Sequence, residues 1–250
     1  FGSINMMVPE LPAMITRLGG AEYKGLTIAL FTLTAGISRP FSGKLTDTVG
    51  RVPVMVFGSL VCVVCSLLYP VAGTVAALLA LRLLHGFSTG FKPTGTTAFL
   101  ADLIPADRRG EAVGVLGIAG SLGMAAGPAA GAWLAQQFSL TAMFFASSAA
   151  ALLSVLVMGQ MRETLPTEQR QPFRLGLLRI GPDEIIEPAV FGPALVMLLT
   201  VVSYGMVVTL IPDLSDQLRL PNRGTFFTVM TVASLAARFG AGRVSDRLGR

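Results

Sequence analysis

Long apolar stretches separated by short polar turns run along the whole sequence. Seven of them have about the length that an α-helix needs to cross a membrane, ~20 residues for ~30 Å of hydrocarbon, and an eighth, at residues 1–16, has the character of the end of another. The seven are residues 25–42, 53–71, 75–99, 112–134, 140–161, 189–211 and 224–241. Since successive all-apolar helices of this length do not fit one soluble core, the pattern predicts an all-α polytopic membrane protein.

Composition and charge agree with a membrane protein and argue against a nucleic-acid-binding one. The 250 residues are 52% hydrophobic and 13% charged, whereas soluble domains average about 25% charged residues. The net charge of +5 comes from basic residues in the short turns, and the sequence shows no nucleic-acid-binding module. Eleven Lys and Arg residues fall in one alternate set of turns and four in the other. The positive-inside rule places the first set in the cytoplasm, so we expect a multi-pass protein of the plasma (inner) membrane.

The longest connection, residues 162–188, divides the spans into two groups. It is polar, mixed in charge and contains three prolines, Pro166, Pro172 and Pro182. We therefore predict a first transmembrane lobe over residues 1–161, a central cytoplasmic loop over 162–188, and the start of a second lobe over 189–250.

Two turns at equivalent positions of the two lobes share a motif. A Gly-x-x-x-Asp-x-x-Gly-Arg pattern follows the span at 25–42 and returns after the span at 224–241. The first copy contains Gly43, Asp47, Gly50 and Arg51, with Arg39 four residues earlier, and the second contains Gly242, Asp246, Gly249 and Arg250, with Arg238 four residues earlier. A repeat of this kind indicates an internal duplication.

The chemistry of this turn fits a conformational latch. Gly43 and Gly50 allow a tight turn and a close approach of two helices. Asp47 can pair with nearby cations (Arg39, Lys44 and Arg51), or it can cap a helix N-terminus, where the dipole favours a negative charge. Such a bond can be made in one arrangement of the lobes and broken in another. The alternative is a tight turn whose basic residues serve topology alone, and the duplication favours the latch.

Both copies resemble the G-x-L-x-D-x-x-G-R loop signature of the major facilitator superfamily, and the resemblance extends over the whole chain. It implies two six-helix lobes related by pseudo-symmetry, of which this chain would cover most of the N-terminal lobe and the first two helices of the C-terminal lobe. It also implies that the loop holds the outward-open state. Spans nine to twelve and the start of the first span would lie outside this sequence.

Ionisable residues within the predicted spans are candidates for a cavity or coupling site. Arg82, His85 and Lys92 share one face of the span at 75–99, and cations at membrane depth usually face a watered interior. Residues 82–86 also resemble the R-x-x-Q-G motif of the same family, with His85 at the Gln position, so we expect Arg82 to line the cavity and tune a proton or substrate site. His85 alone is typical of a satisfied interfacial histidine. Lys92 either attracts an anionic substrate or snorkels to the cytoplasmic surface.

Glu10 is the one acid inside a predicted span. Proton coupling needs a carboxylate whose pKa is raised by burial. Either Glu10 serves as that acid, or the acid lies outside this sequence.

Glycines recur every four residues in the span at 112–134. Gly123, Gly127 and Gly131 form a smooth ridge against which another helix can pack, and Pro128 favours a bend. The segment resembles the G-x-x-x-G-P-x-x-G motif of drug/proton antiporters in the same superfamily. A plain packing seam is the alternative.

These features together predict a secondary active transporter that moves a small organic solute by alternating access, most simply proton-coupled efflux. Proton-coupled uptake on the same fold stays an alternative. A membrane-embedded enzyme is disfavoured, because the sequence offers one histidine and a Cys62/Cys65 pair within an apolar span, and no ATP-binding glycine loop is present. We expect no cofactor, metal or nucleic acid, and a monomer that interacts with lipid, protons and its substrate.

Overall fold

The computed structural model describes residues 2–105, 108–181, 191–192, 194–202, 229–230, 232–234 and 236. All regular structure in these residues is helical, as predicted. The chain separates into two compact units, Phe1–Arg179 and Ile180–Arg250, and the fold below is that of the first. Most of the predicted spans at 189–211 and 224–241 and the whole second motif copy (Arg238, Gly242, Asp246, Gly249 and Arg250) lie outside the described residues.

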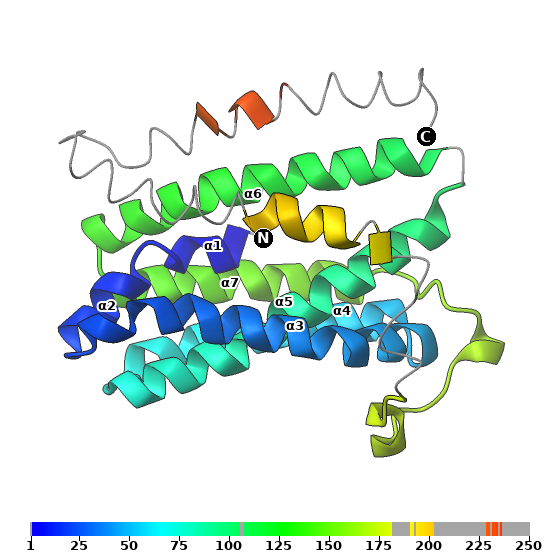
Figure 1. Cartoon of the computed structure of the whole chain (residues 1–250), viewed down its shortest axis with the longest axis horizontal. Coiled ribbons are helices and arrows are strands. Elements are labelled where there is room, and N and C mark those ends of the chain that lie inside the picture. Colours follow the sequence, from blue (N-terminus) through cyan, green and yellow to red (C-terminus); the bar gives the residue numbers. More distant parts are fainter. Residues whose placement is uncertain are drawn as a thin grey trace. The chain divides into compact units, whose positions relative to one another are not determined.

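The described residues of the first unit form seven α-helices (Figure 1). They are α1 (Gly2–Met7), α2 (Leu11–Arg17), α3 (Lys24–Thr48), α4 (Arg51–Leu68), α5 (Val75–Leu103), α6 (Arg109–Gln137) and α7 (Leu140–Gly159). Short 3-10 turns cover Ala21–Tyr23, Tyr69–Val71, Thr167–Gln169 and Leu175–Leu178. Helix α3 packs along α5, α4 packs against both α5 and α7, and α1 packs against α6.

The first predicted span is broken between α1 and α2. Pro9 has no N–H to donate within a helix, and the chain leaves the helix after Met7. It enters α2 at Leu11, with Pro12 in the first turn, where proline is tolerated. Glu10 therefore lies at a helix break and is partly buried, which corrects its expected place inside a continuous span.

Three described helical segments are long and apolar enough to cross a membrane: Arg51–Val71, Ala112–Gln137 and Leu140–Gly159. Helices α3 and α5 have the length, with 25 and 29 residues, yet they are more polar than the other three. Many of their polar residues point inward. Thr27, Thr34, Ser38 and Ser42 of α3 are buried, and so are Arg82, His85 and Ser88 of α5.

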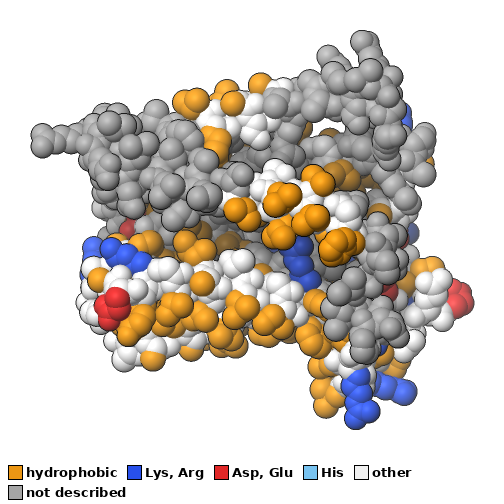
Figure 2. Space-filling view, viewed as in Figure 1, with side chains coloured by type: hydrophobic (Ala, Val, Ile, Leu, Met, Phe, Trp, Pro, Cys, Tyr) orange, Lys and Arg blue, Asp and Glu red, His pale blue; other side chains and the backbone are white. Residues whose placement is uncertain are grey.

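The outward surface of these helices is apolar. On α3, the side chains of Ile28, Leu33 and Ile37 are exposed, whereas most of the hydroxyl side chains of the same helix are buried. Figure 2 shows hydrophobic side chains spread over this face of the unit. An exposed apolar surface around a partly polar interior is the arrangement expected of helices surrounded by lipid.

Hydroxyl side chains on α5 donate hydrogen bonds to their own helix. Ser88 donates to the carbonyl of His85 at 2.7 Å, Thr96 to that of Lys92 at 2.8 Å, and Thr97 to that of Pro93 at 2.9 Å. These polar groups are therefore satisfied without any partner from a neighbouring helix.

Glycines set the distance between α5 and its neighbours. A Cβ at Gly86 would meet the backbone carbonyl of Phe31 on α3, and one at Gly58 on α4 would lie 2.6 Å from the backbone N of Lys92. Because glycine has no Cβ at these two positions, the backbones of the neighbouring helices can approach closely.

Candidate functional site

The motif at residues 43–51 forms a shorter turn than predicted. Helix α3 continues to Thr48, so Gly43 and Asp47 lie within the helix and only Val49 and Gly50 connect it to α4. A Cβ at Gly43 would meet nothing within 4 Å, so this glycine serves neither the turn nor a helix contact, which corrects the expectation. Gly50 has φ +142°, a backbone conformation that residues other than glycine rarely adopt.

Arg51 is the centre of the charged cluster at this turn. Its Nη1 lies 3.3 Å from Asp47 Oδ1 and donates to the carbonyl of Thr46 at 2.6 Å. Its Nε donates to Asp102 Oδ2 at 3.0 Å. The side chain of Arg51 is 13% exposed and that of Asp47 is 72% exposed, so the arginine is held firmly and the aspartate is largely in solvent.

The helix N-terminus at this turn is capped by Glu163, which the sequence analysis did not single out. Its carboxylate accepts the backbone N–H of Arg51 at 3.0 Å and of Val52 at 2.9 Å. These are two of the donors that the first turn of α4 leaves unsatisfied. Asp47 does not take this role, although a cap was one of its two expected roles, because it sits on the last turn of the preceding helix.

The loop after α7 is held against the same cluster. Thr164 donates to Asp102 at 2.7 Å, the N–H of Gln171 donates to the carbonyl of Thr48 at 2.8 Å, and Lys44 donates to the carbonyl of Arg179 at 2.8 Å. Residues 162–179, predicted as part of a separate central loop, therefore belong to the compact first unit.

Acidification tests the cap. Burial alone would raise the pKa of Glu163, but the N–H groups of Leu165 and of the first turn of α4 lower it below its usual value. Since the folded-state pKa is below the unfolded one, the stabilisation is complete above the unfolded pKa, about 4.3, and is lost as the pH falls through the folded value. We expect Glu163→Gln to cost ~1 kcal/mol near pH 6 and to show a weaker loss of stability between pH 5 and 3 than the unsubstituted protein.

Thermal unfolding of the full-length protein in detergent measures this difference. Glu168→Gln is the matched control, because Glu168 is exposed on the same loop. Equal pH profiles for Glu163→Gln and the unsubstituted protein would refute the capping role.

The side chain of Arg82 extends from α5 to contact α3. It is 2% exposed, its Nε donates to the carbonyl of Thr27 at 2.7 Å, and its guanidinium stacks over the ring of Phe31 at 4.2 Å from the centroid. Its Nη1 has no hydrogen-bond partner among the described residues. The expectation that Arg82 lines a cavity stays a prediction.

His85 is fully buried, and its expected place at the membrane interface stays a prediction. Its Nδ1 lies 3.3 Å from the hydroxyl of Tyr69, and Phe31 packs edge-on against its ring. Its Nε2 has no partner among the described residues.

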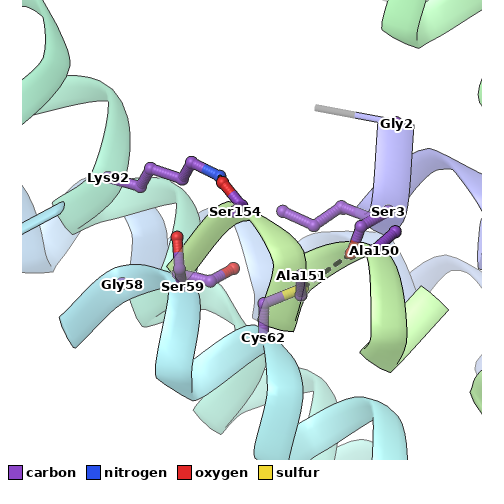
Figure 3. Close-up of a pocket in the computed structure, with 11 residues that line it drawn as sticks. Gly2, Ser3, Gly58, Ser59, Cys62, Lys92, Ala150, Ala151 and Ser154 are labelled. Atoms are coloured by element: carbon purple, nitrogen blue, oxygen red, sulfur yellow. Dashed lines mark hydrogen bonds between the residues drawn. The ribbon is translucent and has the colours of Figure 1, made fainter. Parts of the chain in front are cut away.

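Lys92 points into a pocket of about 240 Å³ between α1, α4, α5 and α7. Its Nζ donates to the hydroxyl of Ser154 on α7 at 2.7 Å. Figure 3 shows this contact, with Ser59 and Cys62 of α4 nearby and Ser3 of α1 hydrogen-bonded to Cys62. The side chain thus reaches across the helix bundle, not toward the end of its own helix.

The glycine ridge of α6 faces α1. A Cβ at Gly127 would lie 2.8 Å from the carbonyl oxygen of Gly2, and one at Gly131 would overlap the carbonyl oxygen of Met6. Gly123 is in looser contact, since its carbonyl oxygen would lie 4.0 Å from a Cβ built at Gly2. Pro128 lies within α6, which stays one helix from Arg109 to Gln137.

Comparison with known proteins gives one family over the whole chain. The model of the Major Facilitator Superfamily matches residues 1–250. Multidrug resistance protein 1 of Bacillus subtilis is 30% identical over 207 residues, which cover 82% of this chain and 52% of that protein. The homolog of the multi-drug resistance efflux pump PmrA of Lactococcus lactis is 35% identical over 160 residues, 62% of this chain and 39% of that protein. The chain thus spans about half, or less, of the length of these relatives.

Solved structures show the same fold. The human organic anion transporter MFSD10 (TETRAN) aligns with 75% of this chain and 50% of its own, at a TM-score of 0.61 and 24% identity. The proton:xylose symporter XylE aligns with 100% of this chain and 66% of its own, at a TM-score of 0.68 and 16% identity. At these identities the likeness concerns the fold alone.

Proposed function

Because this chain belongs to the major facilitator superfamily, we propose that the full-length protein is a secondary active transporter that exports small organic solutes across the membrane. The proposal of export, as opposed to uptake, rests on the similarity to relatives named for multidrug resistance and efflux. The close packing of the α6 glycines against α1 supports it, because this seam contains the antiporter-like motif Gly127-Pro128-x-x-Gly131.

Alternating access needs contacts that hold one arrangement and yield to another. The Arg51 cluster has a firm part and an exchangeable part. Its contact with Asp102 joins the start of α4 to the end of α5, whereas its ion pair with Asp47 is solvent-exposed and is therefore broken at low cost. The proposed latch consists of Arg51 fixed on its own unit and Asp47 able to change partners.

Proton coupling is part of the proposal, and Glu10 is its candidate carrier in this chain. Its place at the break between α1 and α2 leaves it partly buried, next to the helix that contacts the α6 ridge. Substrate, protons and lipid are the proposed partners of a monomer.

Transport by membrane vesicles tests the proposal. Inverted vesicles that contain the full-length protein should accumulate a member of a compound panel, such as ethidium or a quinolone, when the interior is acidic. A protonophore should abolish the accumulation, because it dissipates the proton gradient that drives the exchange. Vesicles without the protein are the control. Movement in the opposite direction under the same gradient would indicate uptake and refute efflux, and accumulation that ignores the gradient would refute proton coupling.

A further inference from the structure

The pocket around Lys92 holds a cation at membrane depth without a carboxylate beside it. In the part of the chain that the structure describes, Lys92 has a neutral partner, the hydroxyl of Ser154, and the pocket lining contains no Asp or Glu. Lys92 lies eleven residues before Leu103, the end of α5, or ~16 Å along the helix axis. The side chain is turned toward Ser154 on α7 and does not extend along its own helix, so in this structure Lys92 does not snorkel.

Hydrogen-bond donors converge on the same space. Ser154 accepts from Lys92, which leaves its own hydroxyl proton to be donated. Ser59 also lines the pocket, is 1% exposed, and has an Oγ without a hydrogen-bond partner among the described residues. A buried hydroxyl without a partner is costly, and a ligand acceptor would satisfy it. An ammonium and two hydroxyl protons, with no acid among the described lining residues, favour an anion.

The rest of the lining indicates what kind of anion. Ile4, Ala150 and Ala151 contribute apolar side chains to the lining. Figure 3 shows the two alanines on α7. A volume of about 240 Å³ is slightly below the range typical of small-molecule sites, which begins at about 300 Å³. A single positive charge balances one negative charge, whereas a doubly charged phosphate would leave an uncompensated buried charge.

We propose that this pocket binds a small monocarboxylate, with the carboxylate on Lys92, Ser154 and Ser59 and the hydrocarbon part against the alanine wall of α7. The site goes beyond the proposed transport function and does not depend on it, because binding is a property of the first helical unit whichever solute is moved.

Direct binding tests the site. Equilibrium dialysis of radiolabelled benzoate against the full-length protein in detergent should show one saturable site. Lys92→Met should weaken binding about ten- to a hundred-fold through loss of a charge-assisted hydrogen bond, and Ser59→Ala about two- to ten-fold through loss of a neutral one. Lys92→Arg should retain most of the affinity, because it keeps the charge. Lys24→Met is the matched control, since Lys24 is exposed at the start of α3 and should have no effect.

Competition identifies the chemical class. Hexanoate should displace benzoate, and benzyl alcohol, which lacks the charge, should not. Absence of saturable binding would overturn the proposal, as would undiminished binding by Lys92→Met or displacement by oleate alone, which would assign the pocket to membrane fatty acids. Size-exclusion profiles and thermal unfolding of each variant separate lost binding from lost folding. Failure of transport with intact benzoate binding would count against the proposed function and leave this site standing.

Discussion

Replacing Gly131 by leucine should abolish transport and leave little folded protein. The Cβ of any residue at this position would overlap the carbonyl oxygen of Met6 on α1. The obstacle is backbone, not the end of a flexible side chain, so the two helices must move apart. Overpacking of well-packed sites costs ~1–3 kcal/mol or more, and here the cost should reach the upper end. Thermal unfolding in detergent and vesicle transport measure both effects.

Gly114→Leu is the matched control for this prediction. Gly114 lies on the same helix, and a Cβ there would meet nothing within 4 Å. We expect nearly unchanged stability and transport for this variant, and an intermediate loss for Gly131→Ala. Equal behaviour of Gly131→Leu and Gly114→Leu would show that α1 and α6 are not in close contact in the membrane.

Arg51→Gln should slow transport more than Asp47→Asn does. The arginine makes three contacts, to Asp47, Asp102 and the carbonyl of Thr46, whereas Asp47 is mostly exposed. Losing the contacts of a partly buried arginine should cost ~1–2 kcal/mol in the arrangement that contains them. A difference of ~1.4 kcal/mol changes the ratio of two lobe arrangements about tenfold. Spin-label distances across the lobes and initial transport rates report the shift.

Equilibrium substrate binding separates a latch from a binding residue. For a latch, Arg51→Gln changes the distribution of conformations and leaves affinity within a modest factor. Arg174→Gln, at an exposed position on the loop after α7, serves as the control. An unchanged distribution of distances together with lost substrate affinity would contradict the latch.

The apolar pattern predicted the helices that meet lipid on much of their surface. The predicted span at 140–161 corresponds to α7 (Leu140–Gly159), and that at 53–71 to α4 with its terminal 3-10 turn. The predicted end of the span at 25–42 was wrong by six residues, because α3 continues from Ser42 to Thr48. Its last turns contain Lys44 and Asp47, and polar residues at the end of a helix resemble a turn when only apolar periodicity is read.

The candidate sites were predicted only where the partners are close in sequence. Asp47 and Arg51 are four residues apart and do lie within ion-pairing distance. Glu163 caps a helix that begins 112 residues earlier, and Ser154 meets Lys92 across 62 residues. No local pattern marks such pairs, because they depend on which helices become neighbours. The close helix contacts of the glycines at 58, 86 and 90 were likewise not predicted, since they depend on which faces α5 shares with α4 and α3.

The hydroxyls of α5 that donate to their own helix bear on how the protein is made. A span that depended on neighbouring helices to satisfy its serines and threonines would enter the bilayer with several polar groups unpaired, each at a cost of a few kcal/mol. On α5, Ser88, Thr96 and Thr97 carry their acceptors with them, three or four residues back along the same helix. This helix can therefore leave the translocation machinery singly. Its two cations need partners on other helices. Arg82 finds the carbonyl of Thr27 on α3, which precedes α5 in the chain, whereas Lys92 must wait for Ser154 on α7, which is made later. The arrival of α7 is therefore the step that completes the packing around α5.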